Sequence, residues 1–171
     1  MPYITPTQLA DGPDMLNELS ELFGVEPALL KAAIAGEDIS DWPEGEPLVA
    51  VDALATIGQR ILQAGGEIDA RLGRRGYPLP QDPVQFPILT VWARAIARYH
   101  LHPQREGTQE TTGRIERDYR DAIRALDLVA DGKLSLGAGD PLATDPAAPE
   151  GGRVRIAGND RLFSRKSLGS L

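Results

Sequence analysis

The side chains best suited to acid–base or metal chemistry in this sequence are its two histidines, His100 and His102. Imidazole titrates close to neutral pH and is a common metal ligand. The residues around them have a helical pattern, which places the two imidazoles about 200° apart around the helix axis. They therefore do not converge on one ion. We interpret them as surface side chains at a helix end and expect no metal site.

Other signatures of catalysis are missing from the sequence. The glycine-rich stretch LGAGD (136–140) is not followed by the Lys-Ser/Thr pair of a phosphate-binding loop. The acidic run at 37–41 lacks the ligand spacing and the glycine of a calcium loop, and no serine stands in a nucleophile-elbow pattern. With no cysteine there is no thiol chemistry and no disulfide. We expect a protein that is not an enzyme and uses no cofactor.

Charge is distributed unevenly along the chain, whose formal net charge is −7. Residues 1–46 contain ten acidic residues and one basic residue, residues 47–131 contain eleven of each, and residues 132–171 contain four acidic and six basic residues. An acidic front end repels nucleic acid, and a basic end favours an acidic protein surface. The alternative is that both ends are merely solvated.

Arginines on the expected helices are candidates for contacts between subunits. Glu116–Arg120 and Arg117–Asp121 are spaced four residues apart, a spacing at which opposite charges stabilise a helix slightly. The arginines either form a solvated face or form a seam at which acidic side chains of one copy meet arginines of the next. The seam candidates are Arg94, Arg98, Arg117 and Arg120.

Helical patterns account for most of the first 132 residues. The predicted fold class is all-α, a small helical bundle with a long, extended C-terminal arm. Thr5 and Gln8 fit a capping box at the start of the first helix, and apolar residues then recur in steps of three and four. Four prolines make 73–87 an extended connector. The expected helices are 6–11, 15–23, 27–35, 48–72, 88–102 and 114–132.

The same steps of three and four identify the side chains that we expect to face the core. In chain order they are Leu19, Phe23, Val25, Leu30, Ala33, Leu54, Ile57, Ile61, Ile68, Leu72, Ile88, Trp92, Ile96, Tyr99, Ile115, Tyr119, Ala122, Leu126 and Val129.

The composition changes after the helical domain at 1–132. Seven of the sixteen residues at 137–152 are glycine or proline, which is typical of a tether. Residues 153–156 (RVRI) alternate as a strand does, and GND at 158–160 is a turn sequence. The segment 133–171 is therefore predicted to be a tether and an arm that forms a short β-hairpin or docks as a strand on a partner.

Two classes of partner are disfavoured. No stretch reaches the roughly 20 apolar residues of a membrane span, and the opening residues lack the features of a secretory signal.

The helices at 15–23 and 27–35, joined at Gly24, resemble a helix-turn-helix unit. Lys31 is the one basic residue of the presumptive recognition helix, however, and acidic residues surround it. A DNA-binding regulator is therefore an alternative rather than the leading hypothesis.

Five segments stand in an informative order: PYITPTQLAD, EIDARLGRRGYPLP, ARAIARYHLH, RDYRDAIRALDLVADGKLSLG and RLFSRKSLGSL. Together they resemble the Mu-like phage and prophage family of small head–tail connector, or adaptor, proteins. The resemblance covers residues 1–12 and 64–171. Residues 13–63, with an acidic loop at 36–47, look like an expanded insert.

The resemblance implies a structural virion protein that forms a ring, usually dodecameric, below the portal protein. Such a ring continues the DNA channel, through which DNA passes without sequence-specific binding, and it docks the tail or tail-terminator proteins. It implies a location in the virion neck after assembly in the cytoplasm of the bacterial host. A tail-completion or tail-terminator protein is a further alternative, although those proteins are often rich in strands.

In related adaptors the C-terminal arm grips the portal, which here corresponds to residues 153–171. We expect two of its residues to anchor a strand, two apolar residues to fill portal pockets and two arginines to pair with portal acids. These are, respectively, Val154 and Ile156, Phe163 and Leu168, and Arg161 and Arg165.

Overall fold

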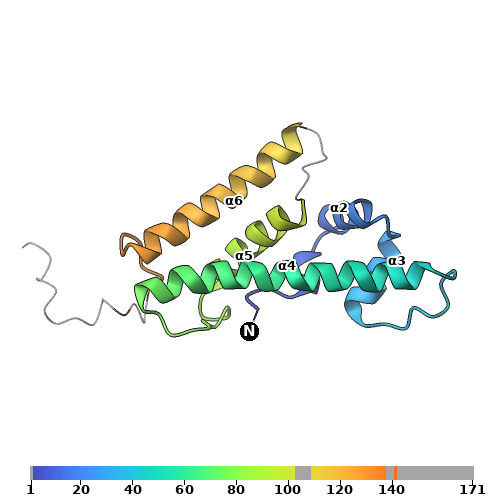
Figure 1. Ribbon diagram of the computed structural model, residues 1–171, viewed down its shortest axis with the longest axis horizontal. Coiled ribbons are helices and arrows are strands. Elements are labelled where there is room, and N and C mark those ends of the chain that lie inside the picture. Colours follow the sequence, from blue (N-terminus) through green and yellow to red (C-terminus); the bar gives the residue numbers. More distant parts are fainter. Residues whose placement is uncertain (1, 103–108, 138–140, 142–171) are drawn as a thin grey trace, which may run out of the picture. The chain divides into compact units, whose positions relative to one another are not determined.

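The computed structural model describes residues 2–102, 109–137 and 141. This part of the chain contains six helices and no strand, which confirms the predicted all-α class. Helices α4, α5 and α6 pack against one another, and α1, α2 and α3 also contact α4 (Figure 1). The helices are α1 (Pro6–Leu9), α2 (Pro13–Phe23), α3 (Pro27–Ala35), α4 (Glu46–Arg75), α5 (Pro87–Leu101) and α6 (Gln109–Ala130).

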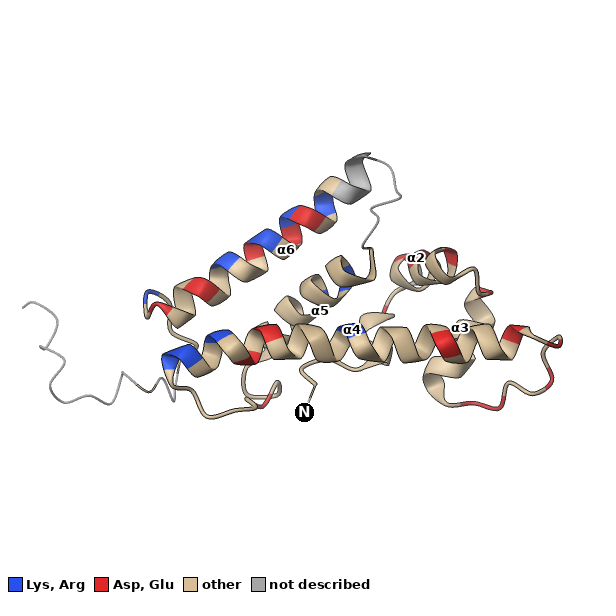
Figure 2. Cartoon of the chain, viewed as in Figure 1, with Lys and Arg blue, Asp and Glu red and all other residues tan. Residues whose placement is uncertain are grey.

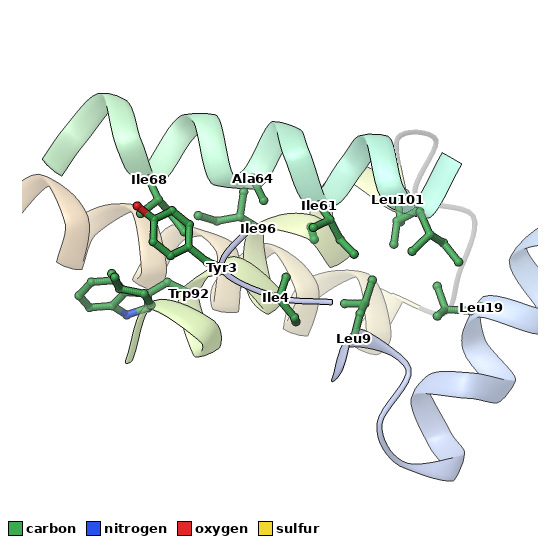
Figure 3. Close-up of a cluster of buried hydrophobic side chains, with 14 of the residues drawn as sticks. Tyr3, Ile4, Leu9, Leu19, Ile61, Ala64, Ile68, Trp92, Ile96 and Leu101 are labelled. Atoms are coloured by element: carbon green, nitrogen blue, oxygen red, sulfur yellow. The ribbon is translucent and has the colours of Figure 1, made fainter. Parts of the chain in front are cut away.

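The N-terminal segment is anchored in the core. The capping box is confirmed: the Gln8 amide donates to Thr5 Oγ1 at 3.2 Å, and the Thr5 amide donates to Gln8 Oε1 at 2.9 Å. Helix α1 ends at Leu9, two residues earlier than predicted. Tyr3, Ile4 and Leu9 are all buried among side chains of the longer helices (Figure 3).

Helices α2 and α3 form the expected pair, each ending at a glycine in the left-handed region. Gly24 has φ 63° and Gly36 has φ 73°, a conformation that glycine adopts without steric cost. Helix α2 starts two residues earlier than predicted because Pro13 occupies its first turn. Phe23 is only partly buried, whereas Leu29, which was not predicted, is buried. Predicted core residues that are buried here are Leu19, Val25, Leu30 and Ala33.

Helix α4 is the long element on which the others pack. Its 30 residues extend about 45 Å. It runs three residues beyond its predicted end because Gly76, with φ 92°, is the residue that caps it. Leu54 was predicted to face inward but is only partly buried. The buried residues of α4 are Ala50, Ala53, Ile57, Ile61, Ala64, Gly65, Ile68 and Leu72.

The start of α5 differs from its prediction. The helix begins at Pro87, and Leu89 rather than Ile88 faces the core: Leu89 is fully buried and Ile88 is 42% exposed. The prediction for Ile88 was therefore wrong, because apolar residues at both positions left the phase of the first turn ambiguous. Trp92 and Ile96 are buried as predicted (Figure 3).

Helix α6 packs on α4 and α5 with the face that the periodicity indicates. Its end is also as predicted: Gly132 has φ 75°, and its amide donates to the Val129 carbonyl at 3.0 Å. Tyr119 is partly rather than fully buried. The predicted core residues that are buried are Ile115, Ala122, Leu126 and Val129.

Contacts divide the chain into Met1–Pro141 and Leu142–Leu171, whereas the change in composition predicted a boundary after residue 132. The second unit lies outside the described residues, as does the predicted hairpin at its centre. Among the described helices, none is both long and apolar enough to cross a membrane.

Candidate functional site

An acidic side chain on α2 joins this helix to the end of α5. Arg98 Nε donates to Glu18 Oε1 at 2.7 Å, and Arg98 Nη2 donates to Glu18 Oε2. His102 Nε2 lies 2.8 Å from Glu18 Oε1. Each of the three side chains is less than 20% exposed. We call Glu18, Arg98 and His102 the Glu18 clasp.

The environment of the Glu18 clasp keeps its carboxylate charged. Burial alone would raise the pKa of Glu18, but hydrogen bonds from His102 and Arg98, and their charges, outweigh burial and lower the pKa to about 2. The hydrogen bond to Glu18 in turn raises the pKa of Arg98. The pair is thus fully ionised at neutral pH and holds α2 against α5.

A second group of charged side chains, the Glu67 network, links α4, α5 and α6. Glu67 Oε1 lies 2.5 Å from His100 Nε2, and Glu67 Oε2 lies 3.7 Å from Arg71 Nη1. Arg71 Nε donates to Asp127 Oδ1 at 3.1 Å. Arg71 therefore bridges an acid on its own helix and an acid on α6.

The two histidines serve different contacts. His100 binds a carboxylate on α4 and His102 binds one on α2, so they do not share a ligand. Their side chains are only 16% and 14% exposed. The interpretation as surface residues at a helix end is therefore wrong, and both imidazoles are interhelical contacts. Among the described residues no group of three or more acidic or imidazole side chains could hold a metal ion.

Aromatic rings extend the Glu67 network. Tyr99 on α5 and Tyr119 on α6 stack with their centroids 3.9 Å apart, and His100 meets Tyr119 edge to face. Burial, with the negative charge of Glu67, raises the pKa of Tyr119. Tyr99 was predicted to be a core residue but is partly buried, because its ring lies at the α5–α6 seam.

Tyr3 ties the N-terminus to two other segments. Its hydroxyl donates to Asp69 on α4 and accepts from the Gln81 amide at 3.2 Å. Its carbonyl accepts from Thr90 Oγ1 on α5 at 3.2 Å. Burial and the Asp69 carboxylate together raise the pKa of Tyr3. The opening segment is therefore part of the helical unit.

Two of the four arginines predicted for a subunit seam bind groups on other helices of their own chain. Arg98 belongs to the Glu18 clasp, and Arg94 Nη2 donates to the carbonyl of Gln8. Arg117 and Arg120 are exposed on α6, where charged residues of both signs follow one another (Figure 2). Arg120 pairs, as predicted, with the glutamate one turn earlier, at 3.5 Å. A seam role for these residues stays a prediction.

The six residues predicted to bind the portal lie outside the described residues. They are Val154, Ile156, Arg161, Phe163, Arg165 and Leu168.

Sequence reasoning missed a second apolar stripe on α4. Leu48, Val51 and Leu62 are 72%, 52% and 65% exposed, and exposed Ala55 lies between them. Steps of three, four and seven residues put these four side chains on one face, about 130° from the centre of the buried face. We call this face the outer stripe. The signal was present in the sequence, because α4 carries two overlapping sets of apolar steps.

A hollow of about 260 Å³ lies along the C-terminal half of α6. Its two aspartates are already paired, Asp127 with Arg71 at 3.1 Å and Asp131 with Arg74 at 2.8 Å. Its remaining lining is apolar and basic. We call this surface the α6 hollow, and its lining residues are Tyr119, Arg120, Ile123, Arg124, Asp127, Leu128 and Asp131.

Comparison with known proteins gives one family. The family model described as "Bacteriophage Mu, Gp36" matches residues 3–156. The chain is 36% identical over 104 residues to the Mu-like prophage FluMu protein gp36 of Haemophilus influenzae. That alignment covers 61% of this chain and 66% of the relative, so the chain spans just under two thirds of the relative's length. No solved structure matches.

Proposed function

The chain belongs to the Bacteriophage Mu, Gp36 family, and on this premise we propose that it is a structural phage protein, a head–tail connector. In this proposal several copies form a ring below the portal protein, continue the DNA channel and dock the tail or tail-terminator proteins. The family match over residues 3–156 carries the proposal, because it spans the helical unit and continues into the C-terminal segment.

The use of the titratable side chains supports a structural rather than a catalytic role. His100 and His102, the residues best suited to acid–base chemistry, each bind a carboxylate between two helices. Among the described residues, the carboxyl with the largest pKa shift is that of Glu18, which is bound by a guanidinium and an imidazole. These groups stabilise the arrangement of helices. The proposed connector accordingly acts without a cofactor.

The charge of the front end supports DNA passage rather than DNA reading. Helices α2 and α3 meet at Gly24 as in a helix-turn-helix unit. Lys31 is the one basic residue among the first 46 residues, which contain ten acids. Neutralising phosphates with basic side chains supplies most non-specific affinity for DNA. An electrophoretic shift of duplex DNA at low salt is therefore not expected, and a clear shift would favour a regulator.

We place the contact with the portal in the C-terminal arm at 153–171. This segment carries five of the six basic residues that follow residue 131, all of them except Lys133, and it alternates apolar and basic side chains at 153–156. Such a segment suits addition to a partner's sheet edge. In the assembled particle the protein would lie in the virion neck, after synthesis in the host cytoplasm.

Truncation tests this assignment. We expect the full-length chain to bind the purified portal ring of the same phage, and a variant lacking 153–171 to lose at least tenfold in affinity. A variant lacking only 169–171 is the matched control and should bind as the full chain does. Unchanged affinity after the longer truncation would refute the role of the arm. Failure of the full-length chain to bind any portal ring would refute the connector function itself.

A further inference from the structure

We propose that the first turns of α4 in one copy of this chain dock into the α6 hollow of a neighbouring copy. The helices cross antiparallel, with Leu48 against Leu128 and Asp52 against Arg124. This inference deepens the proposed function, on which it rests, by assigning the two surfaces that build the ring.

The α4 side of the contact is an exposed apolar surface with one acidic border. Leu48 is 72% exposed and Val51 52% exposed. Asp52 lies one helical turn after Leu48, and its side chain is exposed beside Leu48 and Val51. Exposed apolar side chains that cluster on one face mark a surface that another protein covers.

The α6 side has the matching composition. Ile123 and Leu128 supply apolar side chains to the hollow. Asp127 and Asp131 are paired with α4 arginines of their own chain, and Arg120 is paired with Glu116. The charge that the hollow offers to a partner is therefore that of Arg124. Arg124 stands one turn before Leu128, the reverse of the order of Leu48 and Asp52 on α4.

This reversal selects the antiparallel register. When Leu48 contacts Leu128, Asp52 is brought opposite Arg124, since each is four residues away in the opposite chain direction. The same register brings the exposed Glu44 toward Lys133, whose side chain is 67% exposed and also pairs with Asp131 of its own chain at 3.4 Å. An apolar centre with two opposite-charge pairs at its edge is the usual anatomy of a protein interface.

The two surfaces cannot meet within one chain. The α6 hollow is fixed beside Arg71 and Arg74, near the C-terminal end of α4. Leu48 lies 23 residues before Arg71 on the same helix, or about 35 Å away. The occupant of the hollow is therefore a second copy. A contact between two different surfaces leaves each copy with one of each kind free. A chain of such contacts forms a ring when the rotation between neighbouring copies closes, and an open filament when it does not.

Each contact is small. Two turns of helix cover on the order of 300 Å² per partner, less than the roughly 800 Å² per partner of a stable pair. Assembly is therefore expected to depend on concentration and on ring closure, and covalent capture is the appropriate measurement.

The absence of cysteine from the chain makes capture direct. Full-length protein carrying both Leu48→Cys and Leu128→Cys should form a disulfide-linked ladder of dimers, trimers and larger species on mild oxidation, with or without the portal ring. A disulfide needs Cα atoms within roughly 7 Å, so the two cysteines of one chain cannot pair. No ladder in either condition would overturn the proposal.

Single and displaced cysteines are the controls. Leu48→Cys or Leu128→Cys alone should remain monomeric under oxidation. Leu62→Cys combined with Leu128→Cys should also give no ladder, because residue 62 lies about 21 Å from residue 48 along the outer stripe. Ladders as strong from the displaced pair as from the designed pair would overturn the stated register.

Exchange of charge tests the same contact without a covalent bond. Asp52→Arg or Arg124→Asp alone should reduce the ladder yield at least fivefold in the double-cysteine background, and the two together should restore it. Arg114→Asp, on an exposed α6 position about 15 Å from Arg124, should have no effect. Failure of the combined exchange to restore the ladder would count against the Asp52–Arg124 pair.

Binding to the portal ring separates the two proposals. Portal binding without a ladder would leave the connector function in place and refute this contact. A ladder without portal binding would support the contact and refute the connector function.

Discussion

At the scale of single residues, partly buried charge determines how the helices meet. Glu18 is tied to Arg98 and His102, and Glu67 to His100. Removing one partner of such a pair leaves the other charge desolvated, which costs more than the pair contributes. The same residues are also the ones that a search for catalytic residues would select. Their contacts between helices support a role in helix packing rather than in catalysis.

Replacing Glu18 with glutamine should lower the free energy of unfolding by about 2 kcal/mol at pH 7, because the hydrogen bonds to Arg98 and His102 lose their charge assistance. Urea denaturation followed by circular dichroism measures this. Glu21→Gln, an exposed change on the same helix, should shift the unfolding free energy by less than about 0.5 kcal/mol. Equal effects of both changes would contradict the clasp.

Lowering the pH should remove the contribution of the Glu18 carboxylate to the free energy of unfolding. Its pKa is about 2 in the folded chain, against an ordinary value of 4.5. A lowered pKa in the folded state stabilises the fold above pH 4.5, and this stabilisation is lost as the pH falls toward 2. The difference in unfolding free energy between the wild type and Glu18→Gln should therefore narrow from pH 5 to pH 2. A constant difference over this range would contradict the assignment.

At the scale of helices, local signals predicted most of the fold. The capping box at Thr5, the glycine stop at Gly24 and the buried face of α6 are all set by neighbours within four residues. The choice of Leu89 over Ile88 was missed because both are apolar and only packing in the folded core selects one of them. The outer stripe was missed because α4 has apolar residues on two faces.

Local signals in the sequence do not predict contacts between helices that are far apart in the chain. Arg98 and Glu18 are 80 positions apart, and nothing in the spacing of either residue identifies the other. For this reason the contacts that two seam candidates, Arg94 and Arg98, make inside the chain were not predicted. Charge alone did not separate them from Arg117 and Arg120, which are exposed on α6.

Gly65 tests the packing of the N-terminus on α4. A Cβ at this position would lie 3.9 Å from the Tyr3 ring, an ordinary contact, so Gly65→Ala should stabilise the chain by up to about 1 kcal/mol through helix propensity. Gly65→Leu should instead destabilise it by about 1–3 kcal/mol by displacing Tyr3. Thermal unfolding measures both, with exposed Gly66→Ala as the control for propensity. A neutral Gly65→Leu would contradict this packing.

At the scale of the whole molecule, two surfaces proposed to meet between copies lie near opposite ends of α4. One is formed by the first turns of α4, and the other is the α6 hollow. The first turns of α4 carry Leu48 and Val51 of the outer stripe and follow an acidic loop, and its last turns hold α6 through Arg71 and Arg74 (Figure 2). A subunit with different surfaces at the two ends of one rigid helix is suited to head-to-tail assembly. The proposed contact places Glu44, an acidic residue of the front end, between neighbouring copies.

Salt should weaken the proposed assembly. The pairs Asp52–Arg124 and Glu44–Lys133 are at the edge of the contact, where ions screen them over a Debye length of about 8 Å at physiological salt and about 3 Å at 1 M. The ladder yield of the Leu48→Cys, Leu128→Cys variant should fall when sodium chloride is raised from 50 mM to 1 M. A higher yield at high salt would indicate an apolar contact without these pairs.

The most direct measurement is electron microscopy of the purified full-length protein mixed with its portal ring. The connector function predicts an additional ring of density, coaxial with the portal and on the side where the tail attaches, that is absent from portal alone. Portal rings with no added density at saturating protein concentration would contradict it.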